Sequence, residues 1–322
     1  MTNPAMIHFH DFHPTLNDFQ ADILAGLNNG QKTIAPKYFY DAQGSLLFDR
    51  ICQLPEYYLT RTEINLLKQY GAPIADAIGP DAILFELGSG SSRKIRLLLE
   101  ALHPSAYVPM DISKKHLFRS AQVLAKDYPW LEIHALCVDY AGVWNLPPGL
   151  IGTPRIAFFP GSSIGNLATG EAVTLLARIA GLVGGDGGLL IGVDLIKDID
   201  VLEAAYNDRQ KVTEAFNKNL LVRLNRELNA NFQVDRFKHR AFYNRGLNRI
   251  EMHLVSEREQ CIRIANQLIH FHAGETIHTE NSHKYSIPGF HRLASRAGFH
   301  PVNVWTDPDA LFSIHYLQTR GV

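Results

Sequence analysis

The feature that most constrains the fold of this chain is an apolar segment that runs into a two-glycine turn and then into a helix. Residues 82–87 read Ala-Ile-Leu-Phe-Glu-Leu, Gly88 and Gly90 follow, and a helical pattern starts near Arg93. Glycines let the backbone of such a turn approach a ligand, and the first turn of the helix offers free N–H groups. The segment therefore predicts a strand, a turn and a helix that bind a nucleotide-like cofactor.

Two classes of cofactor use such a turn, the dinucleotides and S-adenosylmethionine. The dinucleotide pattern requires a third glycine for the pyrophosphate, and Arg93 occupies that position here. Glu86, just before the turn, suits an uncharged ribose and a sulfonium better than a diphosphate. The turn thus favours S-adenosylmethionine, although two glycines alone are a weak signal and other features have to support it.

Apolar strands alternate with helical patterns between residues 82 and 196. Such a succession predicts a buried parallel sheet with right-handed crossovers, that is, a doubly wound α/β fold. After a helix near 289–297, a terminal antiparallel hairpin is predicted, which is the usual end of an S-adenosylmethionine-dependent methyltransferase domain. The predicted parallel strands are 83–86, 107–110, 133–138, 156–159 and 189–193, and those of the hairpin are 301–305 and 311–317.

Two stretches lie outside this pattern and predict a second, α+β domain. Residues 1–80 look helical, and residues 197–285 begin with a helical segment and continue as strands. Since the hairpin after residue 285 belongs to the first domain, residues 197–285 must be an insertion. We expect a ligand cleft between the domains. The predicted insertion elements are helix 199–228 and strands 237–243, 249–255 and 261–268. The predicted domains are 61–196 with 286–322 for the cofactor, and 1–60 with 197–285 for the substrate.

Acidic residues end three of the predicted parallel strands, at the edge where open α/β sheets bind ligands. They are Glu86, Asp111 and Asp139, and each could accept a hydrogen bond from a ribose hydroxyl or an adenine amine. Asp111 lies 23 positions after Gly88 (111 − 88), close to the ~20 expected of a ribose-binding acid. The alternative for each acid is a helix N-cap. Tyr140 follows Asp139, and its ring could cover adenine or belong to the core.

The composition excludes several classes of partner. Lysine and arginine (31) nearly balance aspartate and glutamate (32), so the chain lacks the electrostatic footprint of a protein that binds nucleic acid or an anionic membrane. Cys52, Cys137 and Cys261 are far apart and fit a reducing compartment. No apolar run resembles a signal peptide or a membrane span. We expect a cytoplasmic monomer that acts on a small polar molecule, without a nucleic-acid or membrane partner.

Histidines near the start of the chain raise the question of a metal site. His8, His10 and His13 are close in sequence, but no cysteine or acidic set completes a metal-binding pattern. We therefore predict a solvated tail and no metal. His270 and His272 alternate on a predicted strand and receive the same interpretation.

Several segments together resemble the histidine-specific Nα-methyltransferases of ergothioneine biosynthesis. Two of the motifs, Leu54-Pro-Glu-Tyr-Tyr58 and Gly161-Ser-Ser-Ile-Gly-Asn-Leu167, are not general methyltransferase features. The resemblance extends from Pro36 to the terminal hairpin. It implies transfer of three methyl groups from S-adenosylmethionine to the α-amine of L-histidine, which gives hercynine. It also implies two domains of the kind predicted above. The segments that carry it are 86–94, 107–113, 158–167, 204–232 and 279–284.

The resemblance further implies the residues of the site. The implied cofactor residues are Gly88, Lys94, Asp111, Asp139 and Tyr140. The residues implied for the carboxylate and amine of the substrate are Tyr57, Asn166 and Tyr206, and those for the imidazole are Glu280 and Ser282. The residues implied to line the pocket are Tyr40, Phe48, Gly161, Ser163 and Met252. No catalytic base is identified, and Tyr40 and Asn166 are expected to position the substrate. Ser163 stands where threonine is common, and residues 1–14 have no counterpart.

The chemistry of imidazole agrees with two of these assignments. Neutral imidazole has one N–H donor and one lone-pair acceptor, which a carboxylate and a hydroxyl can match. Glu280 and Ser282 are two positions apart and would point to the same side of an extended segment. The alternative is that both are exposed residues of a loop before Pro288. Other ordinary interpretations stay open: Tyr57 and Tyr206 as interface tyrosines, Asn166 as a helix cap, and Met252 as a core residue.

Two other functions have to be weighed. The first is the same methyl transfer to another aromatic amino acid, which Glu280 opposes because a buried unpaired carboxylate is costly. The second is a regulatory protein that binds S-adenosylmethionine without turning it over. The presence of the substrate residues together with the glycine turn argues against this function. A nucleic-acid methyltransferase is disfavoured by the charge balance and because Pro160-Gly-Ser-Ser stands where an N/D-P-P-Y/F motif is expected.

Overall fold

The computed structural model describes residues 7–12, 16–90, 92–139, 150 and 154–319. Internal contacts divide the chain into two compact units. The first unit comprises Met1–His13, Leu59–Ile196 and Lys284–Val322, and the second comprises Pro14–Tyr58 and Lys197–His283. Each unit is therefore assembled from segments that lie far apart in the sequence.

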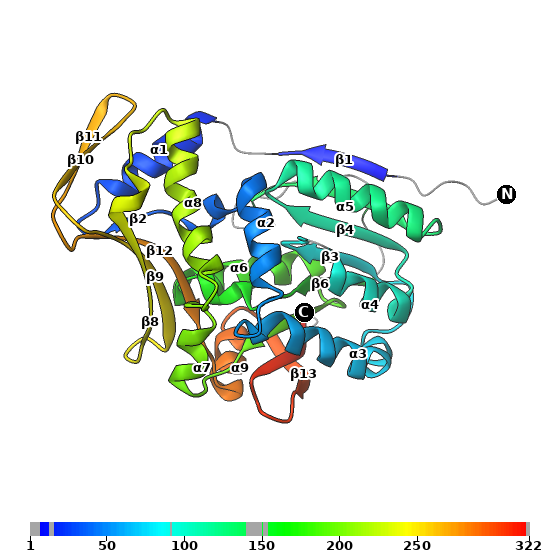
Figure 1. Ribbon diagram of the computed structural model, residues 1–322. Helices are drawn as coiled ribbons and strands as arrows, with labels where there is room; N and C mark the ends of the chain where they lie inside the picture. The colour runs from blue at the N-terminus through cyan, green and yellow to red at the C-terminus, as the bar shows by residue number, and fades with distance from the viewer. Residues whose placement is uncertain (1–6, 13–15, 91, 140–149, 151–153, 320–322) are drawn as a thin grey trace. The chain divides into compact units, whose positions relative to one another are not determined.

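The first unit is built on an eight-stranded sheet with the order β1-β5-β4-β3-β6-β7-β14-β13, in which the strands from β1 to β7 pair in parallel and β14 and β13 are antiparallel (Figure 1). β3 and β7 are buried along their whole length, as strands covered on both faces should be. The strands are β1 (Ile7–Asp11), β3 (Ile83–Leu87), β4 (Ala106–Asp111), β5 (Glu132–Cys137), β6 (Arg155–Phe159), β7 (Gly188–Asp194), β13 (Phe299–Thr306) and β14 (Phe312–Thr319).

Amphipathic helices pack on this sheet. α4 (Arg93–Leu102) buries Ile95, Leu98, Leu99 and Leu102, the stripe expected of a helix with a period of 3.6 residues. α5 packs on β4 and β5, and α6 packs on β6 and β7. Within the described residues, no helix is long and apolar enough to cross a membrane. The other helices of this unit are α3 (Tyr58–Ile78), α5 (Lys114–Asp127), α6 (Thr169–Val183) and α9 (Ile287–Ser295).

The predicted doubly wound α/β fold is confirmed. All five predicted parallel strands are present, and the terminal hairpin is present as β13 and β14. β14 pairs antiparallel with β7, from Phe312↔Asp194 to Gln318↔Gly188. The hairpin therefore extends the parallel sheet at its β7 side.

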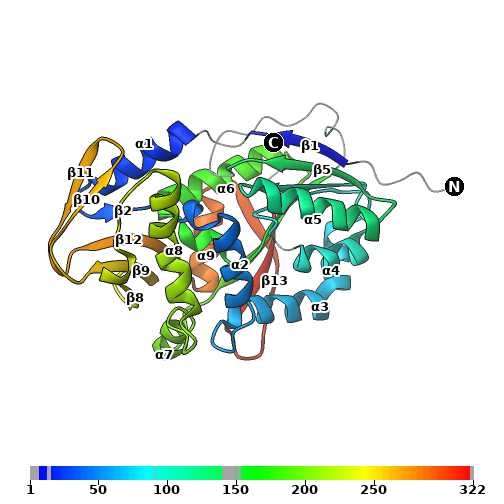
Figure 2. The same cartoon turned by 45° about the horizontal axis from the view of Figure 1, so that its top comes forward.

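The N-terminal strand is the main departure from the prediction in this unit. β1 pairs in parallel with β5, from Ile7↔Ile133 to Asp11↔Cys137, and the two strands lie side by side (Figure 2). Phe9 points toward α5, where its ring lies 5.6 Å from that of Phe118. Residues 7–12 thus belong to the first unit, and the prediction that they form a solvated tail of the substrate domain is wrong.

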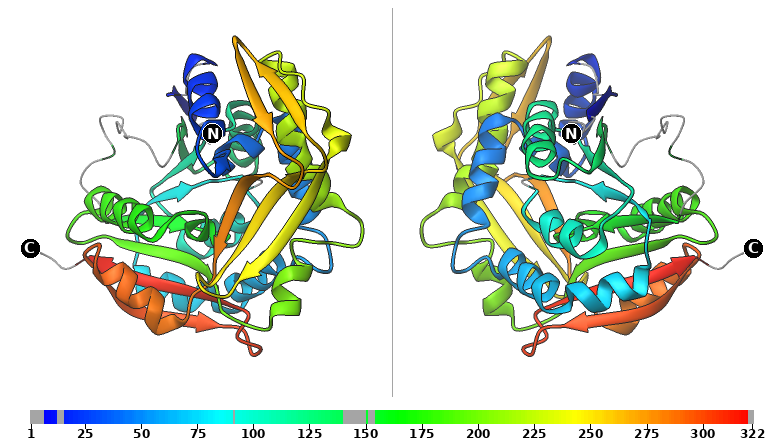
Figure 3. Two further views of the ribbon diagram at one scale, coloured as in Figure 1. Left: turned by 90° about the vertical axis from the view of Figure 1, so that its left-hand side faces the viewer. Right: turned by 90° about the vertical axis from the view of Figure 1, so that its right-hand side faces the viewer.

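The second unit has a four-stranded sheet with the order β2-β12-β9-β8 and a separate β10–β11 hairpin (Figure 3, left, with β8 to β12 in yellow and orange). α8 packs on β8 and β9, and α2 packs on α8. The strands are β2 (Lys32–Thr33), β8 (Phe237–Asn244), β9 (Arg249–Ser256), β10 (Gln260–Ile264), β11 (Gln267–Phe271) and β12 (Thr276–His283). The helices are α1 (Leu16–Leu27), η1 (Pro36–Phe39), α2 (Ala42–Ile51), α7 (Ile199–Ala204), α8 (Val212–Glu227) and η3 (Val234–Arg236).

Two predicted elements of this unit are divided in the structure. The predicted helix 199–228 is interrupted between α7 and α8, where the carboxylate of Asp208 accepts hydrogen bonds from Val212 N (2.9 Å) and Thr213 N (2.8 Å). The predicted strand 261–268 is instead a hairpin that turns at Ala265, which has a φ of 50°. Both interruptions are local turns that hydrophobic periodicity does not reveal.

Candidate active site

The glycine turn follows β3 directly. Gly88 and Gly90 have φ angles of 71° and 47°, a region that residues with a Cβ rarely adopt. The N–H of Gly88 donates to the carbonyl of Met110 at 2.8 Å, which ties the turn to β4. α4 begins at Arg93, so the predicted strand, turn and helix are all present.

Asp111 is the last residue of β4, and its carboxylate bridges two backbone N–H groups. Its Oδ2 accepts from Gly90 N at 3.0 Å, and its Oδ1 accepts from Ser113 N at 2.8 Å. Burial raises the pKa of Asp111, and these backbone hydrogen bonds oppose the rise. The N-cap of α5 is Ser113 rather than Asp111, so the alternative that Asp111 is a cap does not hold.

Asp139 follows β5, the strand next to β4. Asp111 and Asp139 therefore follow adjacent parallel strands at the same edge of the sheet, as predicted. Tyr140 lies outside the described residues, so its place beside adenine stays a prediction.

Two serines of the glycine turn supply hydroxyl groups that the sequence analysis did not single out. Ser89 and Ser92 are each 5% exposed, and neither Oγ has a hydrogen-bond partner within the described part of the chain. Buried hydroxyls are normally paired, so these two are suited to a polar ligand. Donors beside a helix N-terminus fit a carboxylate, and S-adenosylmethionine carries one at its amino-acid end. The residues present thus fit this cofactor.

Replacement of Asp111 by alanine should weaken binding of S-adenosylmethionine by about 1.5–3 kcal/mol, the range for hydrogen bonds to a charged group. The carboxylate both holds the glycine turn and lies where ribose hydroxyls are expected. Isothermal titration with S-adenosylhomocysteine measures the effect, and circular dichroism checks that the variant is folded. Unchanged affinity in a folded variant would contradict the assignment of Asp111.

Glu86 is the acidic residue of β3 and is only 1% exposed. The hydroxyl of Tyr107 on β4 donates a hydrogen bond to its Oε2. Burial raises the pKa of Glu86 to about 8, although the hydrogen bond from Tyr107 and the charge of Lys94 act in the opposite direction. Glu86 is thus mostly neutral at pH 7, and in the structure it bonds within the sheet to Tyr107.

The raised pKa of Glu86 predicts a pH-dependent stability. Between its ordinary value of 4.5 and about 8, the unfolded chain releases a proton that the folded chain keeps, so stability falls as pH rises through this window. Relative to Glu86→Gln, the wild type should lose up to about 1.4 kcal/mol per pH unit. Urea unfolding of both proteins at several pH values measures this slope. Parallel pH profiles would show that Glu86 ionises normally.

Lys94, a predicted cofactor residue, forms an ion pair with a carboxylate that the sequence analysis missed. Its Nζ lies 2.5 Å from Oε2 of Glu63 in α3, whose side chain is fully buried. Both carboxylate oxygens of Glu63 also accept from the N–H of Gly161, each at 3.0 Å. A Cβ at Gly192 would overlap this carboxylate, so glycine is required there. The carboxylate of Glu63 therefore contacts both Lys94, a predicted cofactor residue, and Gly161, a predicted substrate residue.

The loop after β6 carries three predicted pocket residues. Gly161 has a φ of 77°, and Ser163 and Asn166 are the first and last residues of η2. α6 is capped two residues later, where Ala168 N donates to Oε2 of Glu171 at 2.8 Å. Asn166 is therefore not the cap of α6, and this alternative for it is excluded.

In the second unit, the predicted aromatic residues form one cluster. Ring centroids are 6.2 Å apart for Tyr57 and Tyr206, 6.2 Å for Phe48 and Tyr57, and 5.6 Å for Tyr40 and Phe48. Phe216 of α8 joins the cluster at 5.9 Å from both Tyr40 and Phe48. Phe216 cannot be identified from the sequence as a member of this cluster, because its position in a helix looks like an ordinary core position.

Tyr57 lies between Phe48 and Tyr206 in this cluster and is buried. Burial raises the pKa of its phenol well above the ordinary value, and the neighbouring Tyr206, Cys52, Glu280 and Tyr40 raise it further. The phenol therefore stays protonated near neutral pH. Tyr57 can donate a hydrogen bond to a carboxylate, but it is not suited to accept a proton as a base.

A β-bulge in β12 decides the direction of Glu280. His278 pairs with His253, but Glu280 pairs with Met252, so one extra residue lies between them on β12. The bulge changes the face on which the following residues project. Glu280 and Ser282 thus share the face of Met252, as expected of two residues that contact one ligand. Met252 is 1% exposed.

Hydrogen bonds fix the residues around this face. The hydroxyl of Tyr206 donates to Ser282 Oγ at 2.8 Å. The carbonyl oxygen of Tyr206 is an acceptor, so His239 donates to it through Nε2 at 2.9 Å. Nδ1 of His239 then accepts from Nδ2 of Asn217 at 2.9 Å. Asn217 Oδ1 accepts from Thr279 Oγ1 (2.8 Å), next to Glu280 in the chain. This network connects Tyr206 to the bulge and was not foreseen from the sequence.

The predicted site residues thus fall into two sets. Those of the first unit are Gly88, Lys94, Asp111, Asp139, Gly161, Ser163 and Asn166. Those of the second unit are Tyr40, Phe48, Tyr57, Tyr206, Met252, Glu280 and Ser282.

The amino-acid sequence of this chain is similar to a family of methyltransferases and to several known proteins. A sequence profile described as "Histidine-specific methyltransferase, SAM-dependent" matches residues 19–319. The histidine N-alpha-methyltransferase of Mycobacterium tuberculosis is 39% identical over 299 residues, which are 91% of this chain and 92% of the relative. The ergothioneine biosynthesis protein 1 of Neurospora crassa is 32% identical over 288 residues, 86% of this chain but 32% of the relative. A 4-dimethylallyltryptophan N-methyltransferase of Claviceps purpurea is 26% identical over 321 residues, 92% of this chain and 93% of the relative.

Proposed function

Because the chain belongs to the histidine-specific, S-adenosylmethionine-dependent methyltransferases, we propose that it transfers three methyl groups to the α-amine of L-histidine and forms hercynine. The observation that carries the choice of substrate is the position of Glu280 and Ser282, which lie two residues apart after the bulge of β12 and share the face of Met252. A carboxylate and a hydroxyl on one face match the donor and the acceptor of neutral imidazole.

The first unit supplies the groups for the methyl donor in this proposal. Gly88 lets the backbone approach the cofactor, Asp111 and Asp139 accept from its ribose and adenine, and Lys94 lies at its amino-acid end. The hydroxyls of Ser89 and Ser92, which have no partner among the described residues, support this assignment, since they are donors beside a helix N-terminus. When bound, S-adenosylmethionine supplies an activated methyl group on a sulfonium.

The second unit supplies the groups for the ring and part of the amino-acid end of the substrate. Glu280 accepts from one imidazole nitrogen and Ser282 donates to the other, while Tyr57 and Tyr206 hold the carboxylate and amine. The protonated phenol of Tyr57 supports a donor role. The role of Met252 is to line the ring pocket. Gly161 and Asn166 of the first unit are assigned to the amine end.

Methyl transfer to nitrogen is an in-line displacement, in which the amine lone pair forms the new N–C bond as the S–C bond breaks. Orientation of the amine can contribute roughly 7–11 kcal/mol to such a step. The α-ammonium group must lose a proton before each transfer, and we assign solvent water as its acceptor, because no base is identified among the predicted site residues and Tyr57 is held protonated. We therefore assign Tyr40 and Asn166 to positioning rather than to proton transfer. The amine end must also admit mono- and dimethylated intermediates.

The test is calorimetric titration with L-histidine in the presence of S-adenosylhomocysteine, followed by a methylation assay read by mass spectrometry. We expect binding of histidine, products that carry one, two and three methyl groups, and no reaction with phenylalanine, leucine or tryptophan at equal concentration. Reaction with tryptophan but not histidine would favour the alternative substrate. Cofactor binding without any methyl transfer would favour the regulatory alternative.

Two relatives are named ergothioneine biosynthesis protein 1, and we propose that the reaction of this chain is the first step of that pathway. The monomeric state and the cytoplasmic location are further predictions of the sequence. Size-exclusion chromatography with light scattering tests the first of them.

A further inference from the structure

A cluster of metal-ligand side chains lies at the β1 edge of the first unit's sheet, at the beginning of β5. His8 of β1 and His134 of β5 are Cα partners, and Glu132 precedes His134 by two residues. All three side chains therefore project from one face of the sheet. Phe9, the next residue of β1 after His8, projects from the opposite face, toward Phe118 of α5. The predicted cofactor residue Asp139 follows the other end of β5, so this cluster is separate from the cofactor residues along the strand.

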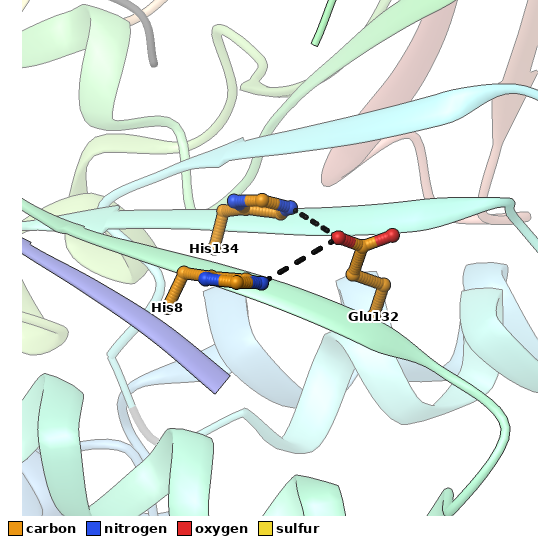
Figure 4. A group of neighbouring side chains, drawn as sticks. All are labelled: His8, Glu132 and His134. Atoms are coloured by element: carbon orange, nitrogen blue, oxygen red, sulfur yellow. Dashed lines mark hydrogen bonds and ion pairs between the residues drawn. The ribbon is translucent and has the colours of Figure 1, made fainter. Parts of the chain in front are cut away.

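The two imidazoles of the cluster converge on one carboxylate oxygen. His134 Nε2 lies 3.0 Å and His8 Nε2 lies 3.6 Å from Oε1 of Glu132 (Figure 4). One ligand atom of each residue lies within 4.8 Å of those of the other two. Glu132 is thus not an isolated surface acid, because it is approached by a histidine from each of two neighbouring strands.

The spacing of these atoms is close to that of a metal site. Zinc lies about 2.0–2.1 Å from histidine nitrogen and about 2.0–2.2 Å from carboxylate oxygen. The ligand atoms of a tetrahedral site are then about 3.3 Å apart. This value lies between the 3.0 Å and 3.6 Å that separate the two imidazole nitrogens from Oε1 of Glu132. Small rotations of the side chains would allow an ion to replace the direct contacts.

The chemistry and exposure of the cluster suit the same ion. Imidazole nitrogens with one carboxylate oxygen are a donor set typical of zinc, whereas calcium and magnesium prefer oxygen alone. The side chain of His134 is 12% exposed, and those of His8 and Glu132 are 38% and 49% exposed. An ion can therefore enter from solvent, and a water molecule can complete the coordination.

We propose that His8, Glu132 and His134 bind a divalent ion of the zinc class. Because His8 belongs to β1 and the other two residues belong to β5, the ion fastens the N-terminal strand to the edge of the sheet. None of these three residues is assigned to the cofactor or the substrate, so the metal site is independent of the methyl-transfer reaction.

Zinc binding by the full-length protein, after removal of metal with a chelator, tests the proposal. The titration uses the Cys261→Ser variant as its background, because Cys261 Sγ lies 3.9 Å from His270 Nε2 on the β10–β11 hairpin and could bind zinc on its own. We expect this background to bind one zinc ion that depends on His8 and Glu132, counted apart from the separate group of Glu251, His253 and His278, whose ligand atoms also lie within 4.8 Å of one another. His8→Gln and Glu132→Gln should each weaken binding by at least about tenfold, since changes even beyond the ligands cost 10–100-fold.

The matched control is His272→Gln. His272 Nδ1 lies 3.3 Å from Oε1 of Glu259, so it is an exposed histidine–carboxylate pair like that of the cluster but without a second histidine ligand. Its replacement should leave zinc affinity unchanged. As a second readout, zinc should slow amide hydrogen exchange in β1 of the wild type and not in His8→Gln. Equal zinc affinity in His8→Gln and its background, or loss of binding in the Cys261→Ser background, would overturn the proposal.

Discussion

Glu280→Ala is expected to lose most of its activity toward histidine and to accept apolar aromatic amino acids better than the wild type does. A site that hydrogen-bonds a polar group can reject analogues that lack it by up to ~10⁴–10⁵, whereas shape alone contributes only ~10–200-fold per methylene. Removal of the carboxylate deletes one of the two ring contacts and also the cost of burying a charge against an apolar ring. The histidine-to-phenylalanine ratio of kcat/KM should therefore fall by about 10² or more.

A competition assay with mass-spectrometric detection of all methylated products measures this ratio. Asn281→Ala is the matched control, because Asn281 is the next residue of β12 and pairs with Glu251 on the other face of the strand. It should keep the preference for histidine. Glu280→Gln keeps the size of the side chain and one acceptor oxygen, so its histidine-to-phenylalanine ratio of kcat/KM should lie between those of Glu280→Ala and the wild type. If Glu280→Ala keeps the full preference of the wild type, this carboxylate does not contact the ring.

The sequence was sufficient to predict the parts of the molecule that depend on local patterns. The strands of the parallel sheet are continuous apolar runs, and the glycine turn after β3 is marked by its own residues. The acids Asp111 and Asp139 were placed correctly at one edge because the ends of parallel strands coincide. These predictions needed no knowledge of contacts between distant segments.

The parts that the sequence did not predict depend on pairing over long distances. β1 looked like a solvated tail because its partner β5 is more than a hundred residues away. The bulge of β12 is a matter of register with β9, which hydrophobic alternation does not encode. The side-chain network through His239 and Asn217 likewise joins three separate elements.

The resemblance to a known family supplied most of the substrate residues, and the structure adds physical support to them unevenly. Tyr57, Tyr206 and Ser282 are in contact or bonded in the second unit. For Asn166, the structure excludes the role of a cap for α6, and its place beside the substrate stays a prediction. Glu63 was missed because a single acid within a helix gives no sequence signal.

Glu63→Ala is expected to destabilise the protein by about 3–5 kcal/mol, the cost of removing one partner of a buried ion pair. The substitution leaves the Lys94 ammonium without its carboxylate and the N–H of Gly161 without its acceptor. Urea unfolding measures the loss. Glu214→Ala is the control, since Glu214 forms a partly exposed i,i+4 pair with Lys218, and i,i+4 pairs on helices contribute only about 0.3–0.5 kcal/mol.

A double-mutant cycle separates the ion pair from simple loss of packing. If the stranded charge of Lys94 causes the destabilisation, Glu63→Ala combined with Lys94→Met should be more stable than Glu63→Ala alone, because the uncompensated cation is gone. Glu63→Gln should lie between wild type and Glu63→Ala, since its amide oxygen can still accept from Gly161. The same variants should bind S-adenosylhomocysteine more weakly, because Lys94 and the Gly161 loop lose their common anchor. Additive effects of the two substitutions, with cofactor affinity unchanged in Glu63→Ala, would show that Glu63 fills space in the core and does not position the site.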